Sequence, residues 1–596
     1  MKTFWVTFFG SVIGVIVGSV LTLVLGIVLL GAVIGAAMQS SEASQNRLPT
    51  GDMVLELDLR IARLDQPSAS PFAFAEPLST VEIVAALQRA ESDDRVKGLF
   101  IRANEFGIAP GQAEELRAAF SAFQDAGKFV IAHAQGFEGV GITSYFAVGN
   151  ADEIWLQDTA SFSAVGLASE TLFFGGLIDQ YGAQAQFEQF HEYKNAANVY
   201  TQSDYTDAHR EAALGLLNSV FDSAITALAA DRGIDAEALR EIIVSGPYSA
   251  EQAEQAGLVD RLGHVATARE VIQTQRTANR VQHVLIEDYI RNQPPSVGSG
   301  AIIALIEGQG PINTGLGDPG LGGAQAIGGD AMANAIDAAA ANNSVRAILI
   351  RIDSPGGSAI ASDQVWDAIM RARDAGKPVV ASMGSLAASG GYYIAAPADL
   401  VFAHGTTITG SIGVLGGKVV VDGALQRVGL NLEPLAVGGE YALAFSPATE
   451  WTEAQRTAFS RLMEDVYEDF TLRVAEGRDL PLSRVQEIAR GRVWTGAQAL
   501  ELGLVDQIGG LRDAVDAARE LAGLEEGQAY QLRRFPRRPT PLEAFQALFG
   551  LSADGMQAAA QLSALLHSPQ VRAALEAQHQ ARQPGVQTYA PVNAPQ

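Results

Sequence analysis

Two stretches of the chain carry nearly the same sequence. Residues 95–102 read RVKGLFIR and residues 344–351 read SVRAILIR. Each stretch is apolar, rich in branched side chains and preceded by residues typical of a helix, which predicts a short buried strand. Strands of parallel sheets are buried on both faces and read as almost continuous apolar runs. The pattern therefore favours an α/β unit that occurs twice.

Three further blocks repeat in the same order. The repeated blocks are 126–128 with 375–377 (both AGK), 151–155 with 398–402 (ADEIW and ADLVF) and 257–260 with 503–506 (both GLVD). The offsets, 249, 249, 247 and 246 residues, stay nearly constant, which chance similarity would not produce. Between the blocks, strands alternate with Ala-rich amphipathic helices such as 112–126 and 363–375. This alternation predicts a tandem duplication of one α/β domain with largely parallel strands packed against helices.

The first forty residues differ from everything that follows. Residues 3–41 contain no Asp, Glu, Lys or Arg, and Phe4–Ala37 is almost wholly apolar. About 20 apolar residues cross a bilayer, whereas the apolar region of a cleaved signal peptide has only about 7–15. We therefore expect an uncleaved membrane anchor. Lys2, ahead of the span, favours an N-terminus on the inside and a body on the outside.

Composition excludes several functions for the body of the protein. The chain has 596 residues, a net charge of −26 and no cysteine. This charge argues against nucleic-acid binding, and the lack of cysteine excludes disulfides, thiolate nucleophiles and Cys-ligated metals. No two histidines have the H-x-x-x-H spacing of helical zinc sites. We expect an anchor over 1–45, α/β domains over 46–295 and 296–525, and an extension over 526–596 that ends in disorder.

The two copies differ where strands of the second copy run into small-residue turns. Gly356-Gly357 follows a strand that ends at Asp353, and such a pair can present free N–H groups to a phosphate or an oxyanion. Ser389 stands at an expected helix start, where the N–H of Gly390 can point to an acyl oxygen on the serine. The first copy lacks both the Gly pair and the serine.

A nucleophilic serine needs a base, and no histidine stands out for that role. Lys194 is a candidate, because the second copy has Glu440-Tyr441-Ala442 where the first has Glu192-Tyr193-Lys194. A lysine base must be buried so that it is neutral. One copy thus carries the candidate serine and the other the candidate lysine, which predicts a composite site.

Simpler interpretations stay open at this point. Ser389 could be a small residue that permits close helix packing, and Lys194 could be a solvated surface lysine. Ser354, Ser362 and Ser385 are weaker candidates for the nucleophile, and Ser354, before Pro355, is better suited to cap the turn.

At these motifs the chain resembles the signal peptide peptidase A family, also called protease IV, in its long bacterial form. The resemblance runs from the anchor to about residue 525 and is carried by residues 353–357, 387–393, 409–413 and 192–194. It implies a ClpP/crotonase-like fold for both domains, an N-terminal transmembrane helix and a homotetramer. It also implies that Ser389 is the nucleophile, Lys194 the general base and Ser411 the group that orients the lysine. The oxyanion hole would come from Gly390 together with Gly356 or Gly357.

The function implied by this resemblance is that of a serine endopeptidase with a Ser–Lys dyad. Such an enzyme degrades released signal peptides and other apolar peptides on the periplasmic face of the cytoplasmic membrane. It needs no metal or organic cofactor. Two alternatives are a catalytically inactive membrane-anchored scaffold of the same fold and a crotonase-type acyl-CoA enzyme, which would need neither Lys194 nor an anchor.

Overall fold

The computed structural model describes residues 48–67, 77–139, 141–292, 300–317, 325–525 and 527–537. The expected anchor over residues 1–45 and the expected disordered end of the extension lie outside these residues. The described part begins with the first strand of the N-terminal half and ends just after a strand that joins the sheet of the C-terminal half.

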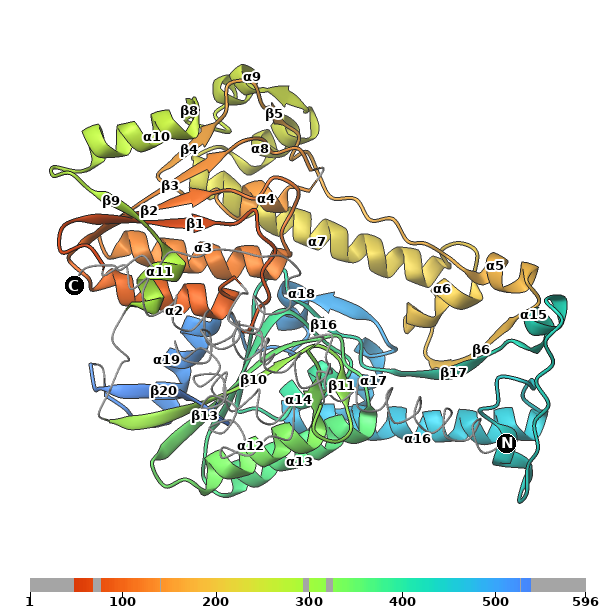
Figure 1. Ribbon diagram of the computed structural model, residues 1–596. Helices are drawn as coiled ribbons and strands as arrows, with labels where there is room; N and C mark the ends of the chain where they lie inside the picture. The colour runs from red at the N-terminus through yellow and green to blue at the C-terminus, as the bar shows by residue number, and fades with distance from the viewer. Residues whose placement is uncertain are drawn as a thin grey trace, which may run out of the picture. The chain divides into compact units, whose positions relative to one another are not determined.

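The N-terminal half is built on a parallel sheet with strand order β8-β4-β3-β2-β1-β9. Helices α2 and α3 cover one face of this sheet and α10 covers the other (Figure 1). The bounds are β1 Met53–Asp58, α2 Thr80–Glu91, β2 Val96–Arg102, α3 Pro110–Asp125, β3 Phe129–Ala134, α4 Thr143–Phe146, β4 Glu153–Leu156, α8 Ala236–Val244, α9 Ala250–Gln255, β8 Arg261–Leu262, α10 Val265–Val271, β9 Gln282–Leu285 and α11 Ile286–Arg291.

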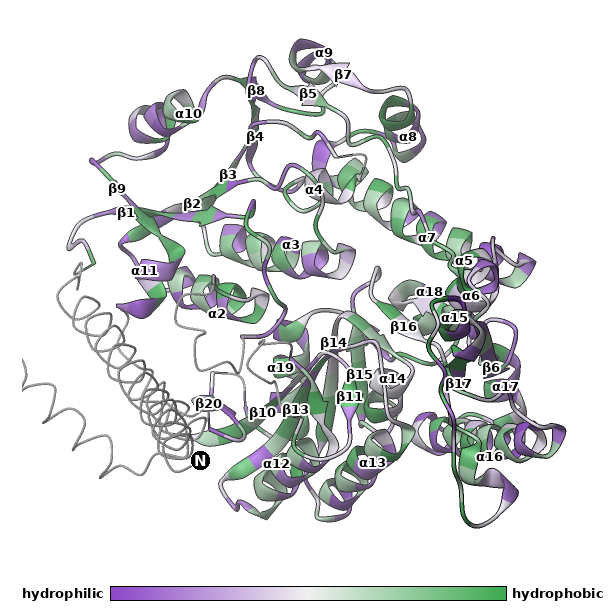
Figure 2. Cartoon of the chain, turned by 45° about the vertical axis from the view of Figure 1, so that its right-hand side comes forward, coloured by the Kyte–Doolittle hydropathy of each residue, from purple (hydrophilic) through white to green (hydrophobic). Residues whose placement is uncertain are grey.

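The C-terminal half repeats this plan with the strand order β18-β16-β14-β13-β10-β20, to which β15 and β19 are added. Apolar residues gather on the central strands β10 and β13, and α12, α13 and α14 pack on one face while α19 packs on the other (Figure 2). The bounds are β10 Ala301–Gln309, α12 Gly329–Ala341, β13 Val345–Ser354, α13 Ala359–Asp374, β14 Val379–Ala388, α14 Gly390–Ala395, β15 Leu400–Ala403, β16 Ile408–Gly410, α16 Glu453–Arg478, α17 Leu482–Ile488, β18 Val493–Thr495, α18 Gly496–Glu501, β19 Gln507–Ile508, α19 Leu511–Leu521 and β20 Tyr530–Arg534.

The same tertiary hydrogen bonds recur in both halves. Tyr145 Oη donates to the carbonyl oxygen of Leu258 at 2.6 Å, and Tyr392 Oη donates to that of Leu504 at 2.8 Å. Likewise, the carboxylate of Asp260 accepts the N–H of Ile154, and that of Asp506 accepts the N–H of Val401, both at 2.7 Å. This repetition at matched positions confirms the predicted tandem duplication.

A two-stranded ribbon joins the halves. β6 (Gln184–Phe190) of the N-terminal half pairs antiparallel with β17 (Val414–Val420) of the C-terminal half, and Phe190 lies opposite Val414. Helices α5 (Gly175–Gln180), α6 (Asn198–Thr201) and α15 (Asp422–Arg427) lie around the ribbon (Figure 1). The residues that follow β6 therefore begin next to the first residue of β17.

A buried ion cluster also connects the halves. Arg351, 1% exposed, lies 2.6 Å from Asp65 and 2.8 Å from Glu115, both from the N-terminal half. Glu115 also lies 2.9 Å from His404 Nε2 and accepts the N–H of Leu511. Buried charges of this kind are tolerated only when they are paired, so the cluster depends on both halves being present.

Helix α7 (Asp207–Arg232) is, among the described residues, the one helix long and apolar enough to cross a membrane. Its residues Ala224, Ile225 and Leu228 lie in the core of the N-terminal half. One third of the most apolar stretch of this helix is buried within the fold.

Candidate active site

Ser389 lies at the junction between β14 and α14. Its N–H donates to Gly410 at 2.8 Å, and its carbonyl accepts the N–H of Tyr393 at 2.9 Å. Its φ is 54° and its ψ is −120°, a conformation that costs a non-glycine residue about 1–3 kcal/mol. Such strain persists where the surroundings impose it, and this backbone conformation sets the direction in which the Cα–Cβ bond of Ser389 points.

Lys194 reaches this serine from the other half of the chain. Its Nζ lies 3.0 Å from Ser389 Oγ and 2.9 Å from Ser411 Oγ, and it donates to the Ser411 carbonyl oxygen at 2.7 Å. The residue is only 6% exposed. Burial lowers the pKa of Lys194 to about 7, because water no longer stabilises the ammonium form. The structure thus brings Lys194 together with Ser389 and Ser411, which follow it in the sequence by 195 and 217 residues.

The predicted backbone donors lie beside the serine. An ideal Cβ on Gly390 would lie 3.2 Å from the nitrogen of Gly357, so these two peptide groups are close. The N–H of Gly356 is already donated to Ser354 Oγ at 3.1 Å. By contrast, no acceptor within the described ranges takes the N–H of Gly357, whose flanking groups bond to Ile312. Of the two alternatives for the second oxyanion donor, the geometry favours Gly357.

Two of the three other candidate serines have structural hydrogen bonds. Ser354 Oγ donates to the carbonyl oxygen of Gly310 at 2.7 Å, so it closes the turn as its position before proline suggested. Ser362 Oγ donates to the carbonyl oxygen of Ser358 at 2.9 Å. His404 is engaged with Glu115 in the interface cluster.

A cavity of about 470 Å³ opens onto Ser389 and Lys194. Its walls are mostly apolar, and they are contributed by Tyr393, Ile408, Leu415, Val466, Phe470 and Val493. In the described part of the chain there is no cluster of His, Asp and Glu able to hold a metal ion. The site therefore combines a serine, a lysine of lowered pKa and backbone N–H groups at the base of an apolar cavity.

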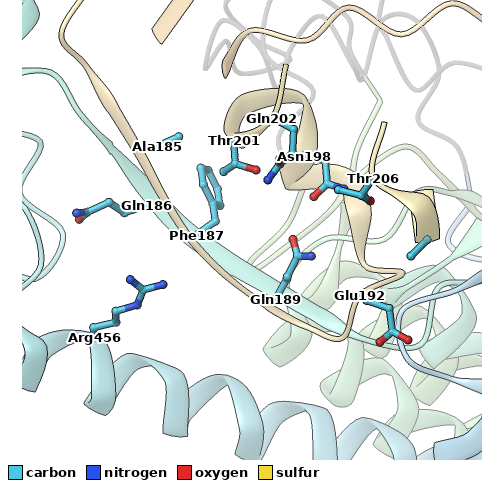
Figure 3. A pocket seen from close by; sticks show the side chains of 11 residues that line it. Ala185, Gln186, Phe187, Gln189, Glu192, Asn198, Thr201, Gln202, Thr206 and Arg456 are labelled. Atoms are coloured by element: carbon cyan, nitrogen blue, oxygen red, sulfur yellow. The ribbon is translucent and has the colours of Figure 1, made fainter. Parts of the chain in front are cut away.

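A second cavity, of about 400 Å³, lies along β6 (Figure 3). Gln189, Asn198 and Gln202 contribute amide side chains to it, and Arg456 reaches it from α16. Arg456 Nε also donates to Glu188 Oε1 at 2.6 Å. Polar and apolar groups line this cavity about equally, whereas apolar groups predominate in the cavity at Ser389.

The sequence analysis missed the turn Arg490-Gly491-Arg492. Gly491 has φ +80°, and an ideal Cβ there would lie 2.5 Å from both the nitrogen and the Cβ of Lys194. The only available signal was a glycine between two arginines ahead of a strand, which does not indicate a contact with a residue so distant in sequence. The contact depends on the ribbon that joins the halves.

A serine and a lysine of lowered pKa beside free N–H groups are the parts of a serine hydrolase. The model of Peptidase family S49 matches residues 122–279 and 371–525, one segment in each half. The chain belongs to this family and is a serine peptidase, as the sequence analysis predicted. The family match decides against the acyl-CoA enzyme.

Relatives match most of the chain. Protease 4 of Salmonella typhi is 30% identical over 83% of this chain and 80% of its own length. The chloroplastic serine protease SPPA of Arabidopsis thaliana is 26% identical over 84% of this chain and 74% of its own. Among solved structures, a ClpP1 variant of Listeria monocytogenes matches 35% of this chain and 94% of its own with a TM-score of 0.23 and 15% identity.

Proposed function

We propose that the protein is a membrane-anchored endopeptidase that uses a Ser–Lys dyad to degrade released signal peptides and other apolar peptides. The observation that carries this proposal is the position of Lys194 Nζ between Ser389 Oγ and both oxygens of Ser411. A neutral amine has two N–H groups and one lone pair. If the N–H groups are donated to Ser411, the lone pair faces the hydroxyl of Ser389.

The reaction follows from this arrangement. Lys194 takes the proton of Ser389 as Oγ attacks the peptide carbonyl, and the protonated amine then gives that proton to the leaving nitrogen. The N–H groups of Gly390 and Gly357 would stabilise the tetrahedral oxyanion, at about 2.7–4 kcal/mol per donor. Water then releases the acyl group from Ser389 in a second step assisted by the same lysine. Every group needed for these steps belongs to the chain.

The substrate class is supported by the cavity and by the resemblance described above. When the apolar walls cover apolar side chains of a peptide, binding is stabilised by about 25 cal/mol for each Å² of apolar surface removed from water. A bilayer anchor would keep the site near peptides that partition into the membrane. We further propose that the catalytic body lies on the periplasmic side of the cytoplasmic membrane and that four chains assemble.

The dyad can be tested on the full-length protein in detergent. A fluorophosphonate, which reacts with activated serines, should label Ser389, and mass spectrometry should locate the adduct there. Lys194→Met should abolish both the labelling and the cleavage of a fluorogenic apolar peptide. Lys377→Met is the matched control, because Lys377 also donates to backbone carbonyls but lies far from the serine in the fold. Labelling of another serine, or full activity of Lys194→Met, would overturn the dyad.

The cellular part of the proposal needs separate measurements. Protease added to intact spheroplasts should digest the body without lysis, and light scattering of the detergent-solubilised protein should give the mass of four chains. A synthetic signal peptide should be cleaved faster than a polar peptide of equal length. Protection of the body, a monomeric mass or equal rates would each contradict the corresponding part.

A further inference from the structure

The backbone of Lys194 is packed against a turn from the other half of the chain. Gly491 lies so close to Lys194 that any side chain would meet the lysine's nitrogen and Cβ at 2.5 Å. Its φ of +80° is also a conformation that glycine adopts without strain and other residues rarely adopt. Glycine at this position therefore allows a contact that no other residue allows.

The same turn holds Ser411, the second partner of the lysine amine. The N–H of Ser411 donates to the carbonyl oxygen of Arg492 at 2.7 Å, and the N–H of Gly491 donates to that of Ile412 at 2.8 Å. Ser411 Oγ lies 3.5 Å from the carbonyl oxygen of Gly491. One turn thus fixes both the lysine and the serine that binds its amine.

The first arginine of the turn binds the residues that lead to Lys194. Arg490 lies 2.7 Å from the carboxylate of Glu192, and its carbonyl oxygen accepts the N–H of His191 at 3.2 Å. His191 in turn packs edge-on against the ring of Tyr467, at 4.8 Å between ring centroids.

The second arginine holds Tyr193 from two directions. Arg492 lies 4.9 Å from the centroid of the Tyr193 ring and 4.5 Å from that of Trp494. It also lies 2.5 Å from the carboxylate of Glu211, which accepts the hydroxyl of Tyr193 at 3.0 Å. The arginines and glutamates that face this segment are thus paired with one another. Lys194 Nζ forms its hydrogen bonds with neutral oxygens, those of Ser389 and Ser411.

We propose that Arg490-Gly491-Arg492 is a clasp, supplied by the C-terminal half, that positions Lys194 and keeps water from its amine. This inference rests on the proposed role of Lys194 as the base. The clasp residues are positioning residues, since they act through the lysine. Exposed ion pairs contribute little to stability, about 0–1 kcal/mol. We therefore assign to the pairs Arg490–Glu192 and Arg492–Glu211 an effect on the position and hydration of Lys194. Water admitted to the amine would favour the ammonium form, which cannot accept the proton of Ser389.

The main test is the pH dependence of the rate for Gly491→Ala in the full-length protein. The added methyl must displace Lys194, and displacements of about 1 Å in a catalytic group can cost about 100-fold in rate. We expect the midpoint of the pH–rate profile to move upward from about 7 toward the ordinary lysine value near 10.4. Activity should therefore recover partly at high pH. A loss that is equal at every pH would mean that the turn has only a structural role.

Milder variants keep the test valid if Gly491→Ala does not fold. Arg492→Met removes the contacts of Arg492 with Glu211 and the two rings, and Glu192→Gln removes the charge that pairs with Arg490. Both variants should move the midpoint upward by a smaller amount. Arg484→Met is the matched control, because Arg484 forms an exposed ion pair with Glu487 on α17 outside the clasp. An unchanged midpoint in both clasp variants would overturn the proposal.

The protonation of Lys194 can also be followed without catalysis. Neutral amines react with acylating reagents and ammonium groups do not, so the extent of Lys194 acylation against pH, read by mass spectrometry, reports its state. We expect this curve to move with the clasp variants in the same direction as the rate profile. If Lys194→Met stays active, the base role fails; if it is inactive while both curves stay in place in the clasp variants, only the clasp fails.

Discussion

The two halves of the molecule share a framework and differ at one junction. The N–H of Ile142 donates to Gly166 at 2.9 Å, just as the N–H of Ser389 donates to Gly410 at 2.8 Å. Ile142 is thus the counterpart of Ser389, but it has an ordinary φ of −57° and is fully buried. The first half has kept the strand, turn and helix of this junction. A buried apolar side chain, that of Ile142, stands where the second half has the hydroxyl of Ser389.

The turn that supplies the oxyanion donor differs in the same way. In the C-terminal half, the N–H of Gly357 lies near Gly390 and has no hydrogen-bond acceptor in the part of the chain that the structure describes. In the N-terminal half, Asn104 Oδ1 accepts the N–H groups of both Phe106 and Gly107, at 2.9 and 2.7 Å, so the turn is closed on itself. The hydrogen bonds that hold each half together are therefore present in both copies. The reactive groups are not: the N-terminal half carries Lys194, and the C-terminal half carries Ser389 and the N–H of Gly357.

Exchanging the junction residues for alanine should separate chemistry from stability, and this is the largest effect we expect. Ser389→Ala should lower kcat by about 10⁶-fold, the loss typical of removing a serine nucleophile, with little change in unfolding free energy. Ile142→Ala should leave kcat near that of the wild type and lower the unfolding free energy by about 2–5 kcal/mol, because it empties a buried site. Peptide cleavage and denaturant unfolding, measured on both variants, would refute this division if Ile142→Ala lost most of its kcat.

Arg351 in β13 and its counterpart Arg102 at the end of β2 offer the next comparison. Arg351 is buried against Asp65 and Glu115, whereas its counterpart Arg102 makes a partly exposed contact with Gln135. Arg351→Met should lower the unfolding free energy by about 3–5 kcal/mol, since it removes the arginine that neutralises the buried carboxylates of Asp65 and Glu115. Arg102→Met should change it by no more than about 1 kcal/mol. Chemical denaturation of both variants measures the difference. Equal losses of unfolding free energy would show that burial between the halves does not make Arg351 more important for stability than Arg102.

The pH dependence of the rate distinguishes Lys194 from the other lysines. Only neutral Lys194 can accept a proton, so below its pKa of about 7 the rate should fall about tenfold per pH unit, and above it the rate should level off. Lys377→Met, at the start of a matched strand of the second half, should keep this profile.

A second group near the site titrates in a neighbouring range. Burial, with Asp65 nearby, raises the pKa of Asp353 to about 6, and its carboxylate accepts the N–H of Leu386 at 3.0 Å. Asp353→Asn should change the profile only below about pH 6 and leave the limb near 7 in place. A profile that is flat from pH 6 to 10 in the wild type would contradict a lysine base.

The sequence was sufficient for the framework because the framework is periodic and duplicated. The strands at residues 95–102 and 344–351 are buried runs whose pattern can be recognised locally. Because the two runs have nearly the same sequence, each supports the assignment of the other as a strand. Ser389 and Lys194 could be proposed because each is missing from the other copy. The clasp at Gly491 and the cluster around Arg351 could not, because both depend on how the ribbon of β6 and β17 and helix α3 bring the halves together. Local pattern carries no information on such long-range contacts.

The smallest effect we predict concerns the paired tyrosines, and it tests whether the framework is equivalent in both halves. Tyr145→Phe and Tyr392→Phe each remove one hydroxyl and leave a buried carbonyl, of Leu258 or Leu504, without its donor. Each should cost about 1–3 kcal/mol of unfolding free energy, and the two losses should agree within about 0.5 kcal/mol. Because Tyr392 lies in the first turn of α14, which follows Ser389 directly, a loss of kcat in Tyr392→Phe beyond the loss of stability would mean that this bond also holds the strained serine in place. Equal kcat values in both variants would assign the bond to the framework alone.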